Sequence, residues 1–148
     1  MLTFEIMSVP ATAVVGVQGR KTRILVADDH AAMRQIVSST LKAYPAFEVC
    51  AEAKDGADAI TLCEELKPDV VVLNVMMPVV TGLEAAKEIK IISPKTAIVI
   101  MSLNADKRLV EAAREIGCNA YIAKTEIGQG LIRAIETAIG SGEFLFLK

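Results

Sequence analysis

Residues 67–78, Lys-Pro-Asp-Val-Val-Val-Leu-Asn-Val-Met-Met-Pro, contain the stretch that decides the fold. The apolar run 70–73 is short and continuous, and residues 67–69 break the preceding helical pattern. Such a run predicts a strand that is buried on both faces, as in parallel sheets covered by helices. The run ends at the polar residue Asn74, so a polar side chain is expected at the end of a central strand.

The same alternation extends along the chain from residue 21. Short apolar runs predict strands at residues 24–27, 70–73, 97–101 and 120–123. The alternating pattern over residues 47–51 predicts a further strand with one wetter face, at the edge of the sheet. Apolar residues at helical spacing predict intervening helices at residues 33–41, 55–66, 83–92, 106–116 and 131–139. This order predicts an α/β fold: a flavodoxin-like, doubly wound sheet of five parallel strands in the order 2-1-3-4-5, with helices on both faces.

Residues 21–140 are expected to form this one domain. Residues 1–20 lack clear periodicity and are interpreted as an N-terminal arm, a disordered leader, or an extension from a mis-assigned start. Residues 141–148 are interpreted as a C-terminal tail or linker stub. Their apolar part is also compatible with a strand that packs back on the sheet or with a contact for another chain.

Composition narrows the class of protein. The 148 residues carry a net charge of −2, which by itself predicts neither a nucleic-acid nor a membrane partner. The 3 cysteines lack metal-ligand spacing and are expected to be buried thiols of a reducing compartment. No apolar stretch reaches the roughly 20 residues of a spanning helix. A cytoplasmic protein is therefore expected.

Polar side chains follow several predicted strands. In a doubly wound sheet the binding site lies at the carboxyl ends of the strands, which directs attention to Asp28, Asp29, Asn74, Ser102 and Lys124. Two adjacent acids can simply cap the next helix, but beside the Asn74 strand end they favour a shared cation site. Magnesium prefers such oxygen ligands. Because Asn74 carries no charge, weak Mg2+ binding is expected.

Each remaining residue also has an ordinary interpretation. Lys124 can be a solvated surface charge, or a phosphate partner and counter-ion opposite the acids. Ser102 can be a plain strand-end hydroxyl or a donor to a phosphoryl oxygen, and Tyr121 can be a core or an interface residue. Their common position at the strand ends favours the functional interpretations.

Residues 22–140 resemble the receiver domain of bacterial two-component response regulators. The matching segments are 24–30, Ile-Leu-Val-Ala-Asp-Asp-His, and 67–78, together with Gly82, Ser102 and 121–124, Tyr-Ile-Ala-Lys. The local sequences at residues 28–30, 102–104 and 124–125 resemble those of receivers that precede a helix-turn-helix DNA-binding domain. Only eight residues follow Gly140, however. Either the receiver stands alone or its output domain lies outside this chain.

The resemblance implies a role for each site residue. Asp28, Asp29 and the Met76 carbonyl would hold Mg2+, Ser102 would be the switch hydroxyl, Tyr121 the switch aromatic and Lys124 the phosphate-sensing lysine. Asn74 stands where the family has its phosphoacceptor aspartate. An amide is a very poor nucleophile, so a phosphorylation-deficient pseudo-receiver is predicted. It would not be an enzyme, and would act through contacts with a sensor histidine kinase or another signalling protein, without direct nucleic-acid or membrane binding.

Two alternatives stay open at this point. In the first, the chain is an ordinary phosphoacceptor receiver of a DNA-binding regulator, in which Asn74 replaced the aspartate and the output domain is absent. In the second, it is a small α/β enzyme that uses the acidic pair with magnesium, although no glycine-rich phosphate loop follows the first strand. The resemblance also suggests a homodimer through the face formed by helix 106–116 and the last helix.

Overall fold

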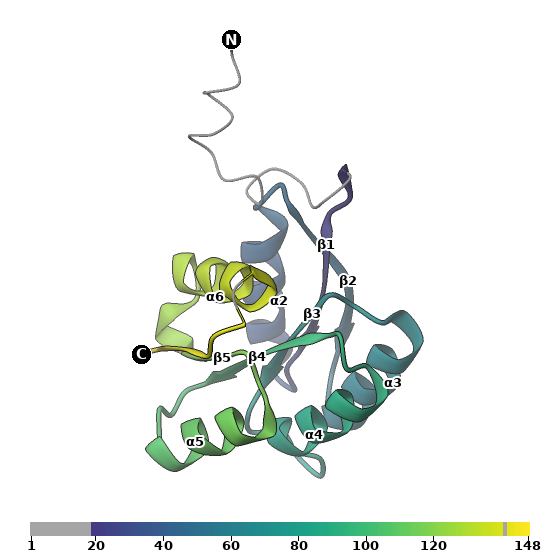
Figure 1. Cartoon of the computed structure of the whole chain (residues 1–148). Coiled ribbons are helices and arrows are strands. Elements are labelled where there is room, and N and C mark those ends of the chain that lie inside the picture. The colour runs from purple at the N-terminus through teal and green to yellow at the C-terminus, as the bar shows by residue number, and fades with distance from the viewer. Residues whose placement is uncertain (1–18, 141) are drawn as a thin grey trace.

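Six parallel strands form one sheet in the order β2-β1-β3-β4-β5-β6 (Figure 1). The computed structural model describes residues 19–140 and 142–148. The strands are β1 (Thr22–Ala27), β2 (Phe47–Ala53), β3 (Val70–Asn74), β4 (Ala97–Ser102), β5 (Ala120–Ala123) and β6 (Leu145–Leu147). The parallel pairing and the order of the first five strands confirm the predicted flavodoxin-like arrangement.

The helices begin and end where capping chemistry allows. They are α2 (Ala31–Lys42), α3 (Gly56–Leu66), α4 (Gly82–Ile92), α5 (Lys107–Ile116) and α6 (Gln129–Gly140), with a 3-10 helix at Lys124–Glu126. Asp55 caps α3 by accepting a hydrogen bond of 2.8 Å from the Asp58 N–H. Gly117 ends α5 with a φ of 103°, the left-handed conformation that glycine adopts freely.

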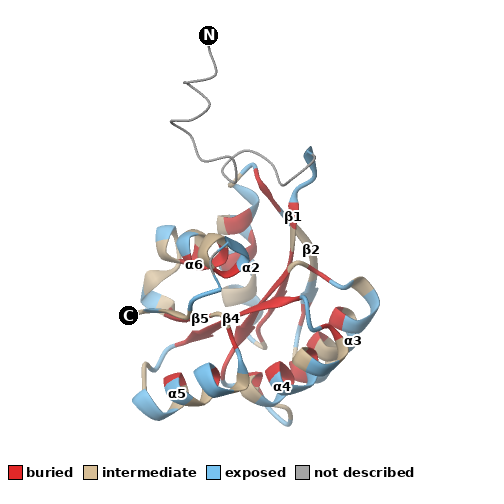
Figure 2. Cartoon of the chain, viewed as in Figure 1, coloured by how far each residue is buried: buried red, intermediate tan, exposed pale blue. Residues whose placement is uncertain are grey.

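The two faces of the sheet bury separate apolar cores (Figure 2). Along β1, Ile24 and Val26 face α2 and α6, whereas Leu25 and Ala27 face α3, α4 and α5. All four side chains are fully buried. This explains why the central strands read as continuous apolar runs, because neither face is left to water. The edge strand β2 is wetter, as its alternating sequence predicted.

The sheet differs from the prediction by one strand. Residues 145–147 of the C-terminal segment form β6 beside β5, which selects the packed-back strand among the interpretations of this segment. Most of the predicted N-terminal arm, residues 1–18, lies outside the described residues. Arg20 lies just after it and pairs with Asp69 through two contacts of 3.0 Å. No helix in the described part of the chain is long and apolar enough to span a membrane.

Candidate functional site

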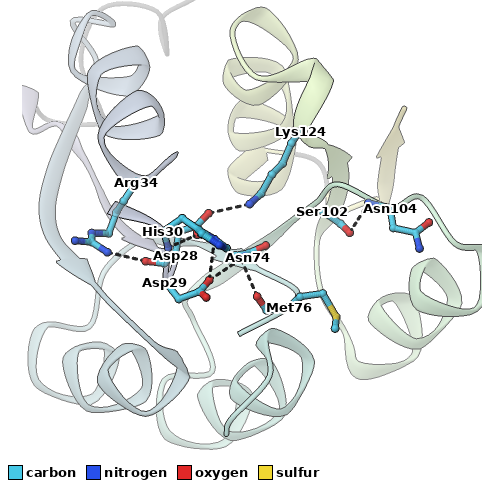
Figure 3. A network of polar contacts seen from close by, with 9 residues as sticks. All are labelled: Asp28, Asp29, His30, Arg34, Asn74, Met76, Ser102, Asn104 and Lys124. Atoms are coloured by element: carbon cyan, nitrogen blue, oxygen red, sulfur yellow. Dashed lines mark hydrogen bonds and ion pairs between the residues drawn. The ribbon is translucent and has the colours of Figure 1, made fainter. Parts of the chain in front are cut away.

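The strand-end residues converge at the carboxyl edge of the sheet (Figure 3). Asp28 and Asp29 directly follow β1, Asn74 ends β3, and Lys124 follows β5. Since β1 and β3 are neighbours in the sheet, their ends meet where the strand order reverses, which is the usual binding crevice of such folds.

The Asn74 side chain lies at the centre of this cluster. Its amide nitrogen is 2.9 Å from the Met76 carbonyl oxygen, 3.1 Å from Asp29 Oδ1 and 3.3 Å from Asp28 Oδ1. An NH2 group has two hydrogens, so three acceptors share them. The amide thus donates to all three groups that the family resemblance assigned to a cation.

Asp28 is a buried carboxylate, and both of its oxygens accept hydrogen bonds. Its Oδ2 accepts from Lys124 Nζ at 3.0 Å, and its Oδ1 accepts from the backbone N–H of His30 at 2.9 Å as well as from Asn74. The side chains of Asp28 and Lys124 are only 0% and 5% exposed, so water screens this ion pair weakly. Breaking such a pair leaves an uncompensated buried charge.

Two residues that the sequence did not single out extend the cluster. His30 places its Nδ1 3.4 Å from Asp28 Oδ1 and 3.3 Å from Asp29 Oδ1, with the imidazole largely exposed. Arg34 donates to the Asp28 carbonyl at 2.8 Å and to Glu52 at 3.2 Å. The sequence could have indicated both residues, because they lie just before and within the first turn of α2, next to the acidic pair.

Ser102 and Asn104 lie apart from the acidic cluster (Figure 3), and Tyr121 joins them through a contact with Asn104. The Ser102 hydroxyl accepts from the Asn104 N–H at 2.9 Å, and the Tyr121 phenol donates to the Asn104 carbonyl at 2.7 Å. Burial raises the pKa of the Tyr121 phenol above its usual value, an effect that Ser102 partly offsets. The structure therefore brings Asp28, Asn74 and Lys124 together and holds the two predicted switch residues in a separate chain of contacts.

Gly82, the first residue of α4, packs directly on the backbone at the end of β3. The Gly82 N–H donates to the Val75 carbonyl at 2.8 Å. A Cβ at residue 82 would lie 2.2 Å from the Asn74 carbonyl oxygen and 2.8 Å from Val75 Cα. No side chain fits in that space, so the sequence needs glycine for this backbone-on-backbone contact.

The donor set bears on whether magnesium fits. Two carboxylates and a backbone carbonyl are the oxygen ligands that Mg2+ prefers, and Asp28, Asp29 and His30 form the group of candidate metal-binding side chains in the described residues. In this arrangement, however, the Asn74 amide presents nitrogen and hydrogens to these oxygens. A tightly held magnesium ion does not fit the site as it stands.

Comparison with known proteins gives a consistent family. The family model described as the response regulator receiver domain matches residues 24–136. The chain is 40% identical over 119 residues to the transcriptional regulatory protein PdtaR of Mycobacterium tuberculosis, covering 79% of this chain and 56% of that protein. It is 42% identical over 107 residues to a protein-glutamate methylesterase/protein-glutamine glutaminase of Pyrococcus abyssi, covering 72% of this chain and 29% of that protein.

A solved structure agrees with the sequence comparisons. A two-component response regulator of the LuxR family from Aurantimonas superposes with a TM-score of 0.80 at 28% identity, covering 84% of this chain and 89% of that chain. The chain spans about half or less of the length of the curated relatives it matches.

Proposed function

Because the chain belongs to the response regulator receiver domain family, we propose that it is a signalling receiver that works without phosphorylation on residue 74. It is proposed to act by binding a sensor histidine kinase or another signalling protein in the cytoplasm, and not as an enzyme. The retained acidic pair and Lys124 support a preserved receiver scaffold, whereas Asn74 removes its nucleophile.

The observation that carries this proposal is the hydrogen bonding of the Asn74 amide. A neutral amide has no lone pair suited to attack a phosphoryl group, and here its NH2 already serves Asp28, Asp29 and the Met76 carbonyl. The acids are thereby satisfied inside the protein. The Asn74 amide and Lys124 thus give these oxygens hydrogen-bond donors that belong to the chain itself.

The test is the intact mass after incubation with acetyl phosphate and magnesium. We expect no phosphoryl adduct on the parent chain and an adduct on the Asn74→Asp variant, whose restored carboxylate can attack the donor. The Asn74→Ala variant is the matched control, because it removes the amide without adding a nucleophile. An adduct on the parent chain would mean that another residue accepts phosphate, and the proposal would be wrong.

A second candidate function is an ordinary phosphoacceptor receiver in which Asn74 replaced the aspartate. The retention of the other site residues, Asp28, Asp29, Ser102 and Lys124, favours it, since a long-abandoned site would have lost more of them. Under this alternative the Asn74→Asp variant is phosphorylated readily by a small phosphodonor. A correctly folded Asn74→Asp variant that stays unmodified would speak against it.

The homodimer suggested by the family resemblance stays a proposal with a physical complication. The face between α5 and α6 includes the edge of β5, and in this structure β6 pairs along that edge. A dimer through this face would therefore have to accommodate or displace the chain's own C-terminal segment.

A further inference from the structure

The C-terminal segment fills the open edge of the sheet with an extended strand. Leu145, Phe146 and Leu147 pair in parallel with Ala120, Tyr121 and Ile122 of β5. The Leu145 N–H donates to the Asn119 carbonyl at 3.1 Å. An edge strand offers a row of unpaired N–H and C=O groups that another strand can pair with. Here the chain supplies that strand itself.

The leucines of the segment pack on one side of the sheet. Leu145 and Leu147 are partly buried against the core under α2 and α6. The Leu147 side chain comes within 3.7 Å of the position that a Cβ on Gly130 of α6 would take. At this distance the leucine lies in ordinary van der Waals range of the first turn of α6.

The phenylalanines of the segment make contacts with α5 and β5. The Phe144 ring lies under the Arg114 guanidinium, 4.6 Å from ring centroid to the guanidinium carbon, a cation–π geometry. The Phe146 ring meets Tyr121 edge to face, with centroids 5.9 Å apart and planes at 75°. Alternate side chains thus use both sides of the β5 edge, as expected of strand addition to a sheet.

These contacts connect the segment to the chain of contacts that Ser102, Asn104 and Tyr121 form. Tyr121 is fully buried beneath its neighbours, and its phenol donates to the Asn104 carbonyl, whose own N–H bonds the Ser102 hydroxyl. Phe146 covers the ring of that same tyrosine while staying 39% exposed itself. The position of Tyr121 is therefore coupled to whether the strand is docked.

We propose that the β5 edge, flanked by α5 and α6, is an acceptor site for an extended apolar segment, and that residues 144–147 are its built-in occupant. While docked, the segment holds Tyr121 in its buried position and closes the face to other partners. Gly142 precedes the segment with a φ of 80°, the left-handed conformation that glycine adopts freely. This occupancy of the β5 edge does not depend on whether residue 74 accepts phosphate.

Tyrosine fluorescence reports on docking directly. The chain has no tryptophan and only 2 tyrosines, so a Tyr44→Phe parent leaves Tyr121 as the single emitter. In this parent, we expect deletion of residues 142–148 or the Phe146→Ala substitution to raise acrylamide quenching roughly two- to threefold, because local opening exposes the ring. Ile91→Ala removes an exposed apolar side chain on α4 and is the control, with unchanged quenching expected.

The acceptor site is then tested in trans. A synthetic peptide of residues 142–148 should restore the low quenching of the deletion variant in a saturable manner, and the same peptide carrying Phe146→Ala should restore less. Unchanged quenching in both the deletion and the Phe146→Ala variant, with circular dichroism still native, would overturn the proposal. The proposal would also be overturned if light scattering showed the deletion variant to be a dimer while Tyr121 stayed shielded from acrylamide. A second folded copy of the chain would then be the natural occupant of the face. If the deletion variant fails to fold, Phe146→Ala decides the question alone.

Discussion

Substitution of Asn74 by aspartate is expected to destabilise the protein strongly in the absence of divalent cations, and magnesium should reverse most of the loss. A carboxylate oxygen placed at the amide nitrogen would lie 3.1 Å from Asp29 Oδ1 and 3.3 Å from Asp28 Oδ1. The variant thus replaces a hydrogen-bond donor with a third negative charge, in a site where Asn74 is 4% exposed.

The magnitude follows from charge and hydrogen bonding. Two like charges about 4 Å apart repel by about 4 kcal/mol at an effective dielectric constant of about 20. Lys124 already compensates Asp28, so one such repulsion remains, and each lost hydrogen bond to a carboxylate adds about 1.5 kcal/mol. Relaxation and proton uptake by the new acid reduce the sum. We expect the free energy of unfolding to fall by roughly 3–5 kcal/mol.

Urea denaturation followed by circular dichroism measures this, because the chain lacks tryptophan. With chelator present, the Asn74→Asp variant should show the full loss. Magnesium at about 100 times its dissociation constant should return about 2.7 kcal/mol to the variant, while the parent should change by less than about 0.5 kcal/mol. A variant as stable as the parent in chelator, or a parent stabilised equally by magnesium, would refute the idea that the amide takes the place of a cation.

Further predictions concern the buried charge and the titrating groups. Lys124→Ala should lower the free energy of unfolding by about 3 kcal/mol by leaving its partner carboxylate buried and unpaired, with Lys124→Arg less harmful in the same denaturation assay. Burial raises the pKa of Cys63 and of Cys118 to about 12, so both thiols should resist Ellman's reagent until the protein is unfolded. The hydrogen bond to Glu136 raises the pKa of Tyr44 from 10.0 to about 12. The stability that this bond confers is thus complete below the unfolded pKa and is lost as the pH rises through the folded one. Absorbance titration of Glu136→Gln should show Tyr44 ionising at a lower pH.

The sequence predicted the central sheet well, because each central strand is specified by a short run of consecutive apolar residues. The continuous apolar runs could only be strands buried on both faces, and their polar ends had to meet at one edge. That logic brought Asp28, Asn74 and Lys124 together correctly. The orientation of the Ser102 hydroxyl could not be predicted from the sequence, because it depends on a hydrogen bond from the backbone N–H of Asn104.

The sixth strand could not be derived from its own residues. Three residues at 145–147 are too few for a periodic signal, and they become a strand only because β5 offers them an unpaired edge. The orientation of the Asn74 amide could not be derived from the sequence either. Its sequence position predicts a lost nucleophile, whereas the gain of a donor that serves three oxygens depends on where those oxygens lie in space.

The contact between Gly82 and the backbone of residues 74 and 75 has a mechanical consequence. Because main chain touches main chain there, the first turn of α4 and the floor of the site behave as one rigid piece, with no flexible side chain between them to absorb a displacement. A protein that grips α4 from outside and shifts its first turn therefore moves the Asn74 carbonyl by a similar amount. The first turn of α4 is thus coupled through backbone contact to the residue at the centre of the acidic cluster.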